Sequence, residues 1–136
     1  SDRAFERVTG YFKDGKIVFG GKTDAAERYI EPTLLSGVAA DAAVMQEEIF
    51  GPLLPVLTYE KFEDISGILR SNPKPLALYI FSENKKHITA INDTCSYGGG
   101  CINDVIMHIA NENAPFGGVG NSGMGRYKLY GLWRSR

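Results

Sequence analysis

The chain has 136 residues, of which 43% are hydrophobic and 23% charged, with a formal net charge of −1. This length is sufficient for one domain with a hydrophobic core, and the composition is ordinary for a globular protein. The charge balance argues against a nucleic-acid-binding protein. The sequence opens with no signal-peptide pattern and has no apolar run near the roughly 18 residues of a spanning helix, so we expect no membrane segment in it.

The first third of the chain predicts a helix followed by strands. Residues 2–12 have an amphipathic pattern, with Phe5, Val8 and Phe12 on the apolar face and Arg3, Glu6 and Arg7 on the outer face. Residues 16–19 form a short apolar run closed by two glycines, which predicts a strand. Residues 29–35 are extended but interrupted by Pro32, which favours an edge strand.

The rest of the chain alternates between strand and helix patterns. Residues 41–48 predict a turn of helix and residues 53–59 a strand. A helix with Phe62, Ile65, Ile68 and Leu69 on one face then ends at Asn72-Pro73. The apolar run 76–81 predicts a strand buried on both faces, and Ser82 is the expected N-cap of the next helix. With extended chain at 98–107 and a loop at 111–125, this alternation predicts an α/β fold, with a mostly parallel sheet flanked by helices.

The most unusual short stretch is residues 45–52, where Glu47 and Glu48 precede Ile49 and Phe50 and a Gly-Pro pair ends the element. Pro52 favours extended backbone before it, so Glu48 and Phe50 are expected at the end of an element, where side chains can reach a ligand. The alternative is a solvated acidic turn with Phe50 as part of the core.

Two further patterns have both an ordinary and a functional interpretation. Residues 118–123 satisfy the dinucleotide-binding pattern G-x-G-x-x-G, but no strand precedes them, so a loop that allows close backbone packing is the favoured interpretation. Cys101 follows three glycines, yet no neighbouring base is evident and an ordinary thiol is expected; a pair with His108 stays open. Free Cys95 and Cys101 favour a reducing, cytoplasmic location, and no metal-ligand spacing is present, so no metal is predicted.

Four motifs in order and spacing resemble the aldehyde dehydrogenase superfamily, in its class 3, fatty- and coniferyl-aldehyde type. They are Glu-Glu-Ile-Phe-Gly-Pro at 47–52, Lys-Pro-Leu-Ala-Leu-Tyr at 74–79, Asn-Asp-Val at 103–105 and Pro-Phe-Gly-Gly-Val-Gly-Asn-Ser-Gly-Met-Gly at 115–125. The resemblance implies that residues 1–125 are the C-terminal part of the family's catalytic domain. Residues 126–136 would be a divergent tail in place of the strand that joins the family's oligomer.

The resemblance also implies roles for four residues. Glu48 corresponds to the carboxylate that accepts hydrogen bonds from the nicotinamide ribose, and Phe50 to the aromatic ring beside the nicotinamide of NAD or NADP. Phe116 corresponds to a ring of the aldehyde pocket, and Asn103 to a polar residue that supports the active-site wall.

The family oxidises aldehydes to carboxylic acids through a cysteine thioester, with hydride passing to NAD(P)+. Its nucleophile and its base belong to motifs that lie before Ser1, so the isolated chain is expected to be inactive. Its partners would be a small-molecule aldehyde and the remainder of the enzyme, as a homo-oligomer when complete. Two other interpretations stay open: a non-catalytic binding or scaffold module, and a small thiol enzyme that uses Cys101.

Overall fold

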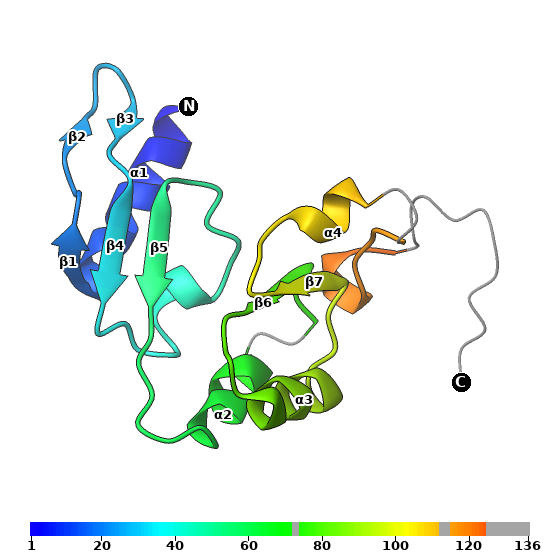
Figure 1. Ribbon diagram of the computed structural model, residues 1–136. Helices are drawn as coiled ribbons and strands as arrows, with labels where there is room; N and C mark the ends of the chain where they lie inside the picture. Colours follow the sequence, from blue (N-terminus) through cyan, green and yellow to red (C-terminus); the bar gives the residue numbers. More distant parts are fainter. Residues whose placement is uncertain (72–73, 112–114, 125–136) are drawn as a thin grey trace. The chain divides into compact units, whose positions relative to one another are not determined.

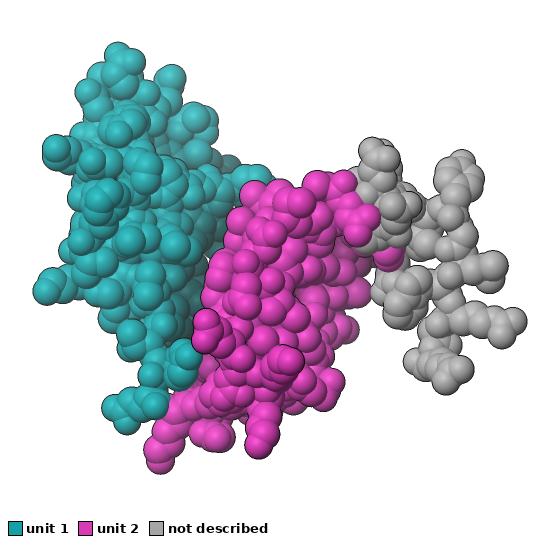
Figure 2. All heavy atoms as spheres, in the orientation of Figure 1, with its two compact units in different colours: residues 1–60 teal, residues 61–136 magenta. Residues whose placement is uncertain are grey.

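The computed structural model describes residues 1–71, 74–111 and 115–124, and the chain divides into two units, Ser1–Glu60 and Lys61–Arg136 (Figure 1; Figure 2). The length alone is compatible with one domain. Packing nevertheless separates the chain at Glu60, and each unit has its own sheet. The two units are therefore described one after the other.

The first unit begins with helix α1 (Asp2–Gly10), which forms where the amphipathic pattern predicts it. The hydroxyl of Ser1 caps it by accepting a hydrogen bond from the amide of Ala4 at 3.4 Å. Val8, on the predicted apolar face, is buried. The α-helix is shorter than predicted, because after Gly10 the chain tightens into the 3-10 helix η1 (Tyr11–Asp14).

The sheet of the first unit has the order β1–β4–β5, formed by β1 (Lys16–Phe19), β4 (Thr33–Ser36) and β5 (Leu53–Val56). β4 pairs antiparallel with β1 and parallel with β5. The prediction of an edge strand is therefore wrong for β4. Pro32 lies just before this strand and removes no amide from it, and the proline within the sheet is Pro55 on the outer strand β5.

Shorter elements complete the first unit. β2 (Thr23–Asp24) and β3 (Tyr29–Ile30) form an antiparallel hairpin. The turn predicted at 41–48 is the 3-10 helix η2 (Ala43–Met45), which is fixed by a hydrogen bond of 2.8 Å from the amide of Val44 to the Asp14 carboxylate. The buried core joins α1, η1, β4, η2 and β5; it consists of Val8, Tyr11, Leu35, Val38, Val44 and Leu53.

The second unit contains a β-α-β unit, as the alternation predicts. Helix α2 (Asp64–Ser71) precedes β6 (Ala77–Ile80), and helix α3 (Lys85–Thr94) connects β6 to its parallel partner β7 (Gly99–Ile102). Ser82 is not the N-cap of α3. Asn84 directly precedes the helix, and its side-chain oxygen accepts from two amides of the first turn, at 3.0 and 3.3 Å.

Two features of this unit differ from the sequence analysis. β6 is mostly half-buried rather than covered on both faces, with Ile80 as its buried residue. A short helix, α4 (Met107–Ala110), follows β7, and the 3-10 helix η3 (Gly120–Ser122) lies in the predicted loop. The α/β class is confirmed, with parallel pairings at β4–β5 and β6–β7. Among the described residues no helix has the length and apolar character needed to span a membrane.

Candidate functional site

The two adjacent carboxylates of the stretch 47–52 have different environments. The Glu47 carboxylate accepts a hydrogen bond from the Tyr11 hydroxyl and forms an ion pair with Arg7 at 3.7 Å. The side chain of Glu48 is exposed and has no hydrogen bond or ion pair with any of the described residues. Glu47 therefore stabilises the fold, whereas the Glu48 carboxylate is available to a ligand.

Arg7 holds the backbone that carries Glu48. Its guanidinium donates hydrogen bonds to the carbonyl of Ile49 at 2.6 Å and to the carbonyl of Glu48 at 3.3 Å. Arg7 was predicted on the outer face of its helix, but its side chain is only 29% exposed because it reaches across to this segment. The sequence signal that could have revealed this role of Arg7 is Tyr11, which lies one turn later on the same face. The Tyr11 hydroxyl accepts a hydrogen bond from the Arg7 guanidinium at 3.1 Å.

Phe50 is not a core residue, because it is 80% exposed. Its φ of 43° lies in the left-handed region, which is costly for a residue with a side chain and is often found at ligand sites. The next residue, Gly51, packs so closely on α1 that a Cβ atom there would be 2.9 Å from a methyl group of Val8. The tight turn thus directs both Glu48 and Phe50 away from the core, just before β5.

The hydrogen bond between Tyr11 and Glu47 predicts a pH dependence of stability. Donation to the Glu47 carboxylate, followed by desolvation, raises the pKa of Tyr11 above its ordinary value of about 10. The stabilisation is fully present below that ordinary value and is lost as the pH rises through the folded-state pKa. We therefore expect the urea midpoint of the native chain to fall above about pH 10, and to fall less in Tyr11→Phe. If the urea midpoint fell equally steeply with pH in the native chain and in Tyr11→Phe, this assignment would be contradicted.

In the second unit, Asn103 acts as a clamp at the end of β7. Its side-chain oxygen accepts from the amide of Ser82 at 2.8 Å, and its side-chain nitrogen donates to the carbonyl of Ser82 at 3.0 Å. Its own amide donates to the carbonyl of Ile80. Asn103 has a φ of 55°, which asparagine tolerates better than most residues. It therefore joins the end of β7 to the segment that leaves β6.

The glycine-rich segments pack backbone against backbone. A Cβ atom at Gly98 would lie 2.3 Å from the carbonyl oxygen of Gly117, and one at Gly118 would lie 2.2 Å from that of Ser122. The loop at 118–123 closes on itself, with the Ser122 hydroxyl accepting from the amide of Val119 at 2.9 Å. This geometry agrees with the close-packing interpretation preferred over a dinucleotide loop.

Phe116 and Cys101 both lie next to His108. The rings of Phe116 and His108 are 6.0 Å apart, and the Cys101 sulfur is 3.7 Å from Nδ1 of His108. A Cys101–His108 pair stayed open from the sequence, because seven positions separate the two residues and no pattern specifies their contact. Within the described residues no three His, Cys, Asp or Glu side chains gather into a metal-binding group. Because this search covers only those residues, the absence of a metal stays a prediction.

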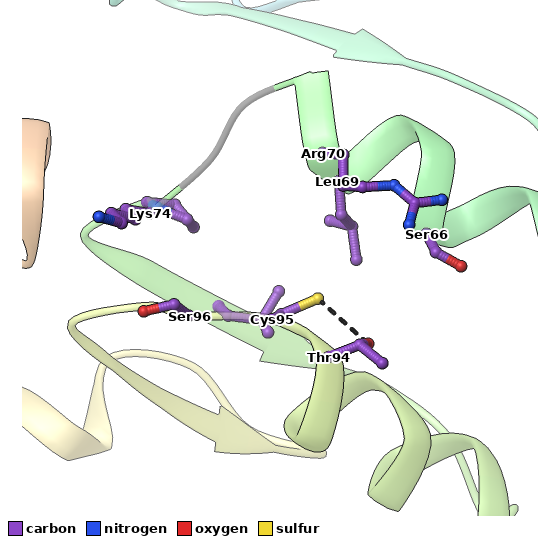
Figure 3. Close-up of a pocket in the computed structure, with 9 residues that line it drawn as sticks. Ser66, Leu69, Arg70, Lys74, Thr94, Cys95 and Ser96 are labelled. Carbon is purple, nitrogen blue, oxygen red and sulfur yellow. Dashed lines mark hydrogen bonds between the residues drawn. The ribbon is translucent and has the colours of Figure 1, made fainter.

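A separate cavity of about 310 Å³ lies between α2 and the end of α3. Figure 3 shows Ser66, Leu69 and Arg70 on its α2 side and Thr94, Cys95 and Ser96 opposite. The sulfur of Cys95 lies 3.8 Å from the Thr94 hydroxyl. The two cysteines thus have different neighbours, a hydroxyl for Cys95 and an imidazole for Cys101.

Comparison with known proteins identifies the family to which these features belong. The model of the aldehyde dehydrogenase family matches residues 1–134 of the chain. The chain belongs to the aldehyde dehydrogenase family. The resemblance seen in the four sequence motifs is thereby confirmed.

Relatives within the aldehyde dehydrogenase family are much longer. The chain is 52% identical over 125 residues to 4,4'-diaponeurosporen-aldehyde dehydrogenase of Staphylococcus aureus, covering 90% of this chain and 27% of the relative. It is 50% identical to aldehyde dehydrogenase family 3 member A2 of Rattus norvegicus, and the match covers 92% of this chain and 26% of that relative. The chain thus spans about a quarter of the length of these relatives.

Solved aldehyde dehydrogenase structures show the same fold. A substrate-bound AldH of Staphylococcus aureus matches with a TM-score of 0.86 at 50% identity, covering 93% of this chain and 28% of that one. An indole-3-acetaldehyde dehydrogenase in complex with NAD+ matches with a TM-score of 0.78 at 32% identity, and the match covers 91% of this chain and 26% of that one.

Proposed function

We propose that this chain supplies the nicotinamide-ribose contact and part of the aldehyde pocket of an NAD(P)-dependent aldehyde dehydrogenase, which converts aldehydes to carboxylic acids. The observation that carries the proposal is the contrast at 47–50. Arg7, Glu47 and Gly51 fix this segment, while the Glu48 carboxylate has no partner among the described residues and the Phe50 ring is exposed. The family and the relatives that the chain matches favour neither a scaffold module nor a small thiol enzyme.

Glu48 and Phe50 fit a dinucleotide of this kind chemically. An ionised carboxylate accepts two O–H donors, as a ribose presents, and charge-assisted hydrogen bonds are about twice as strong as neutral ones. An exposed ring on a fixed backbone offers an apolar surface that restricts where a nicotinamide ring can lie. Glu48 would orient a bound NAD(P)+ and Phe50 would limit the movement of its nicotinamide; the cofactor would supply the hydride acceptor.

Phe116 and Asn103 contribute differently to the proposed aldehyde pocket. Phe116 is half-buried and packs against His108, so one side of its ring is held while the rest can contact a substrate. Both polar atoms of the Asn103 side chain are bound to the Ser82 backbone. Asn103 therefore acts as a positioning residue that holds the wall, without contacting the aldehyde itself.

The complete protein is further proposed to use NAD or NADP, to form a homo-oligomer and to be cytoplasmic. In support, one relative is described as NAD+-bound, and another, from Canis lupus familiaris, is named a dimeric, NADP-preferring aldehyde dehydrogenase. The free cysteines agree with a reducing compartment.

A hybrid enzyme tests the proposal. The 125 matched residues of the Staphylococcus aureus relative would be replaced by those of this chain, and NAD(P)H formation would be followed spectrophotometrically with a panel of aldehydes. We expect the hybrid to oxidise aldehydes. The isolated chain should be inactive, because removing a nucleophile and a base typically costs several powers of ten in rate.

The outcome depends on a folded hybrid, which cofactor protection against thermal unfolding would demonstrate. A folded, cofactor-binding hybrid without aldehyde oxidation would contradict the proposed function. Steady turnover by the isolated chain, free of host enzymes, would contradict the assignment of the nucleophile to another part of the enzyme.

A further inference from the structure

The chain carries a thiol and an imidazole in contact, outside the residues assigned to the nicotinamide contact. Cys101 lies on β7 and His108 on α4, and the Cys101 sulfur is 3.7 Å from Nδ1 of His108. The chain reverses between them through Asn103 and Ile106, both with positive φ. Ile106 is β-branched and its φ is 67°, so this turn is maintained against a local backbone cost.

The imidazole is held on three sides. The ring of Tyr79 lies 5.6 Å away on one side and that of Phe116 lies 6.0 Å away on another. On the third side, a Cβ atom at Gly99 would be 2.6 Å from Cδ2 of His108, so only glycine leaves room for the ring. Packing therefore fixes the orientation in which Nδ1 faces the sulfur.

The second ring nitrogen, Nε2, is buried and has no hydrogen-bond partner among the described residues. Nδ1 can accept a proton only in the tautomer whose own proton lies on Nε2, so in that form the ring holds a buried N–H without an acceptor among the described residues. Because Nδ1 then carries no proton and faces the sulfur, it can accept a proton from the thiol during a reaction and release it again, as a general base does.

We propose that Cys101 and His108 form a covalent capture site for α,β-unsaturated aldehydes and ketones. The sulfur bonds to the β-carbon, the carbon–carbon double bond becomes single, and Nδ1 of His108 accepts the thiol proton. That proton then passes to the α-carbon, so the adduct contains every atom of both reactants and no oxidant or leaving group is needed. Cys101 is partly exposed, and the rings of Tyr79 and Phe116 suit an apolar electrophile.

Capture at Cys101 does not require the proposed dehydrogenase activity, because neither cofactor nor catalytic nucleophile takes part. One consequence does rest on that function. Since His108 packs against Phe116, an adduct on Cys101 alters the support of a ring assigned to the aldehyde pocket. Adduct formation at Cys101 would then change the aldehyde pocket when reactive aldehydes are present.

The test uses Cys95 of the same molecule as an internal control, because its nearest polar partner is the Thr94 hydroxyl. The chain is treated with crotonaldehyde, and adducts on each cysteine are quantified over time by peptide mass spectrometry. We expect Cys101 to react at least about tenfold faster than Cys95, since general-base assistance contributes about a hundredfold or more in favourable cases. Butyraldehyde, which lacks the double bond, should give no stable adduct.

Two variants separate the base from the packing. His108→Phe keeps a ring between Tyr79 and Phe116 but removes the base, and His108→Gln keeps a polar group. Circular dichroism should show that both variants keep the native fold. In both variants the rate of adduct formation at Cys101 divided by that at Cys95 should fall to about one, and the solvent deuterium isotope effect on the Cys101 reaction should disappear. A native ratio of one or below, or a ratio unchanged in both variants, overturns the proposal.

Discussion

Replacing Glu48 by Gln in the hybrid enzyme is expected to lower turnover by about tenfold to a hundredfold. The substitution keeps the shape of the side chain but exchanges a charged acceptor for a neutral one. A hydrogen bond to a charged group is worth about 1.5–3 kcal/mol, which corresponds to that loss. Because the Glu48 side chain has no partner among the described residues, the loss should fall on cofactor orientation and leave the stability of the fold unchanged.

Glu47→Gln is the matched control for this prediction. It removes the same charge one residue earlier, but from a carboxylate already engaged by Tyr11 and Arg7. We expect it to lower the melting temperature and to leave turnover nearly unchanged, because the hydrogen bonds from Arg7 to the carbonyls of Glu48 and Ile49 still hold the segment. If both variants lost activity equally, the effect would come from the charge of the segment as a whole, and the distinction between the two glutamates would fail.

Replacing Gly51 by Ala is expected to destabilise the first unit by about 1–3 kcal/mol, which is typical of overpacking a filled core. The added Cβ would lie 2.9 Å from a methyl group of Val8, and Val8 is buried and cannot move away freely. Because Arg7 and Gly51 both fix the segment that carries Glu48, the same substitution should also reduce turnover in the hybrid enzyme. Urea unfolding of the chain measures the stability change.

Gly10→Ala provides the control of opposite sign in the same unit. Gly10 has φ −59° and ψ −25°, and nothing lies within 4 Å of a Cβ atom built there. Alanine in helical backbone stabilises by about 0.5–1 kcal/mol, partly because it restricts the unfolded chain. A Gly51→Ala protein as stable as the Gly10→Ala protein would show that the turn relaxes without cost.

The sequence indicated the position of Glu48 and Phe50 better than it indicated the contacts that hold their segment in place. The Gly-Pro break after Phe50 correctly predicted that no helix continues through it, since that restriction is local. The helical turn ends earlier than predicted, at Met45, and Glu48 and Phe50 lie in the irregular segment between η2 and β5. The roles of Arg7 and Glu47 could not be predicted, because their contacts join residues about forty positions apart. Nothing in the local pattern distinguishes the structural glutamate from the free one.

The errors in the fold have similar causes. Pro32 suggested an edge strand, yet it lies just outside β4, and such a boundary shift of one residue reverses the conclusion. Cys101 and His108 meet through a turn in which Asn103 and Ile106 have positive φ, and isoleucine gives no sequence signal for that conformation. The tail at 126–136 and its predicted departure from the oligomerisation strand lie outside the described residues.

The deuterium isotope effect on turnover with a deuterated aldehyde tests the nicotinamide role of Glu48 most directly. Hydride transfer, which forms the thioester, depends on how the nicotinamide is oriented, whereas addition of the thiol to the aldehyde and hydrolysis of the thioester do not. The hybrid carrying Glu48→Gln should show a larger isotope effect than the unmodified hybrid, and the hybrid carrying Glu47→Gln should show no change. An isotope effect and a cofactor KM that both stay unchanged in Glu48→Gln would contradict the account, and Glu48 would then be a solvated turn residue.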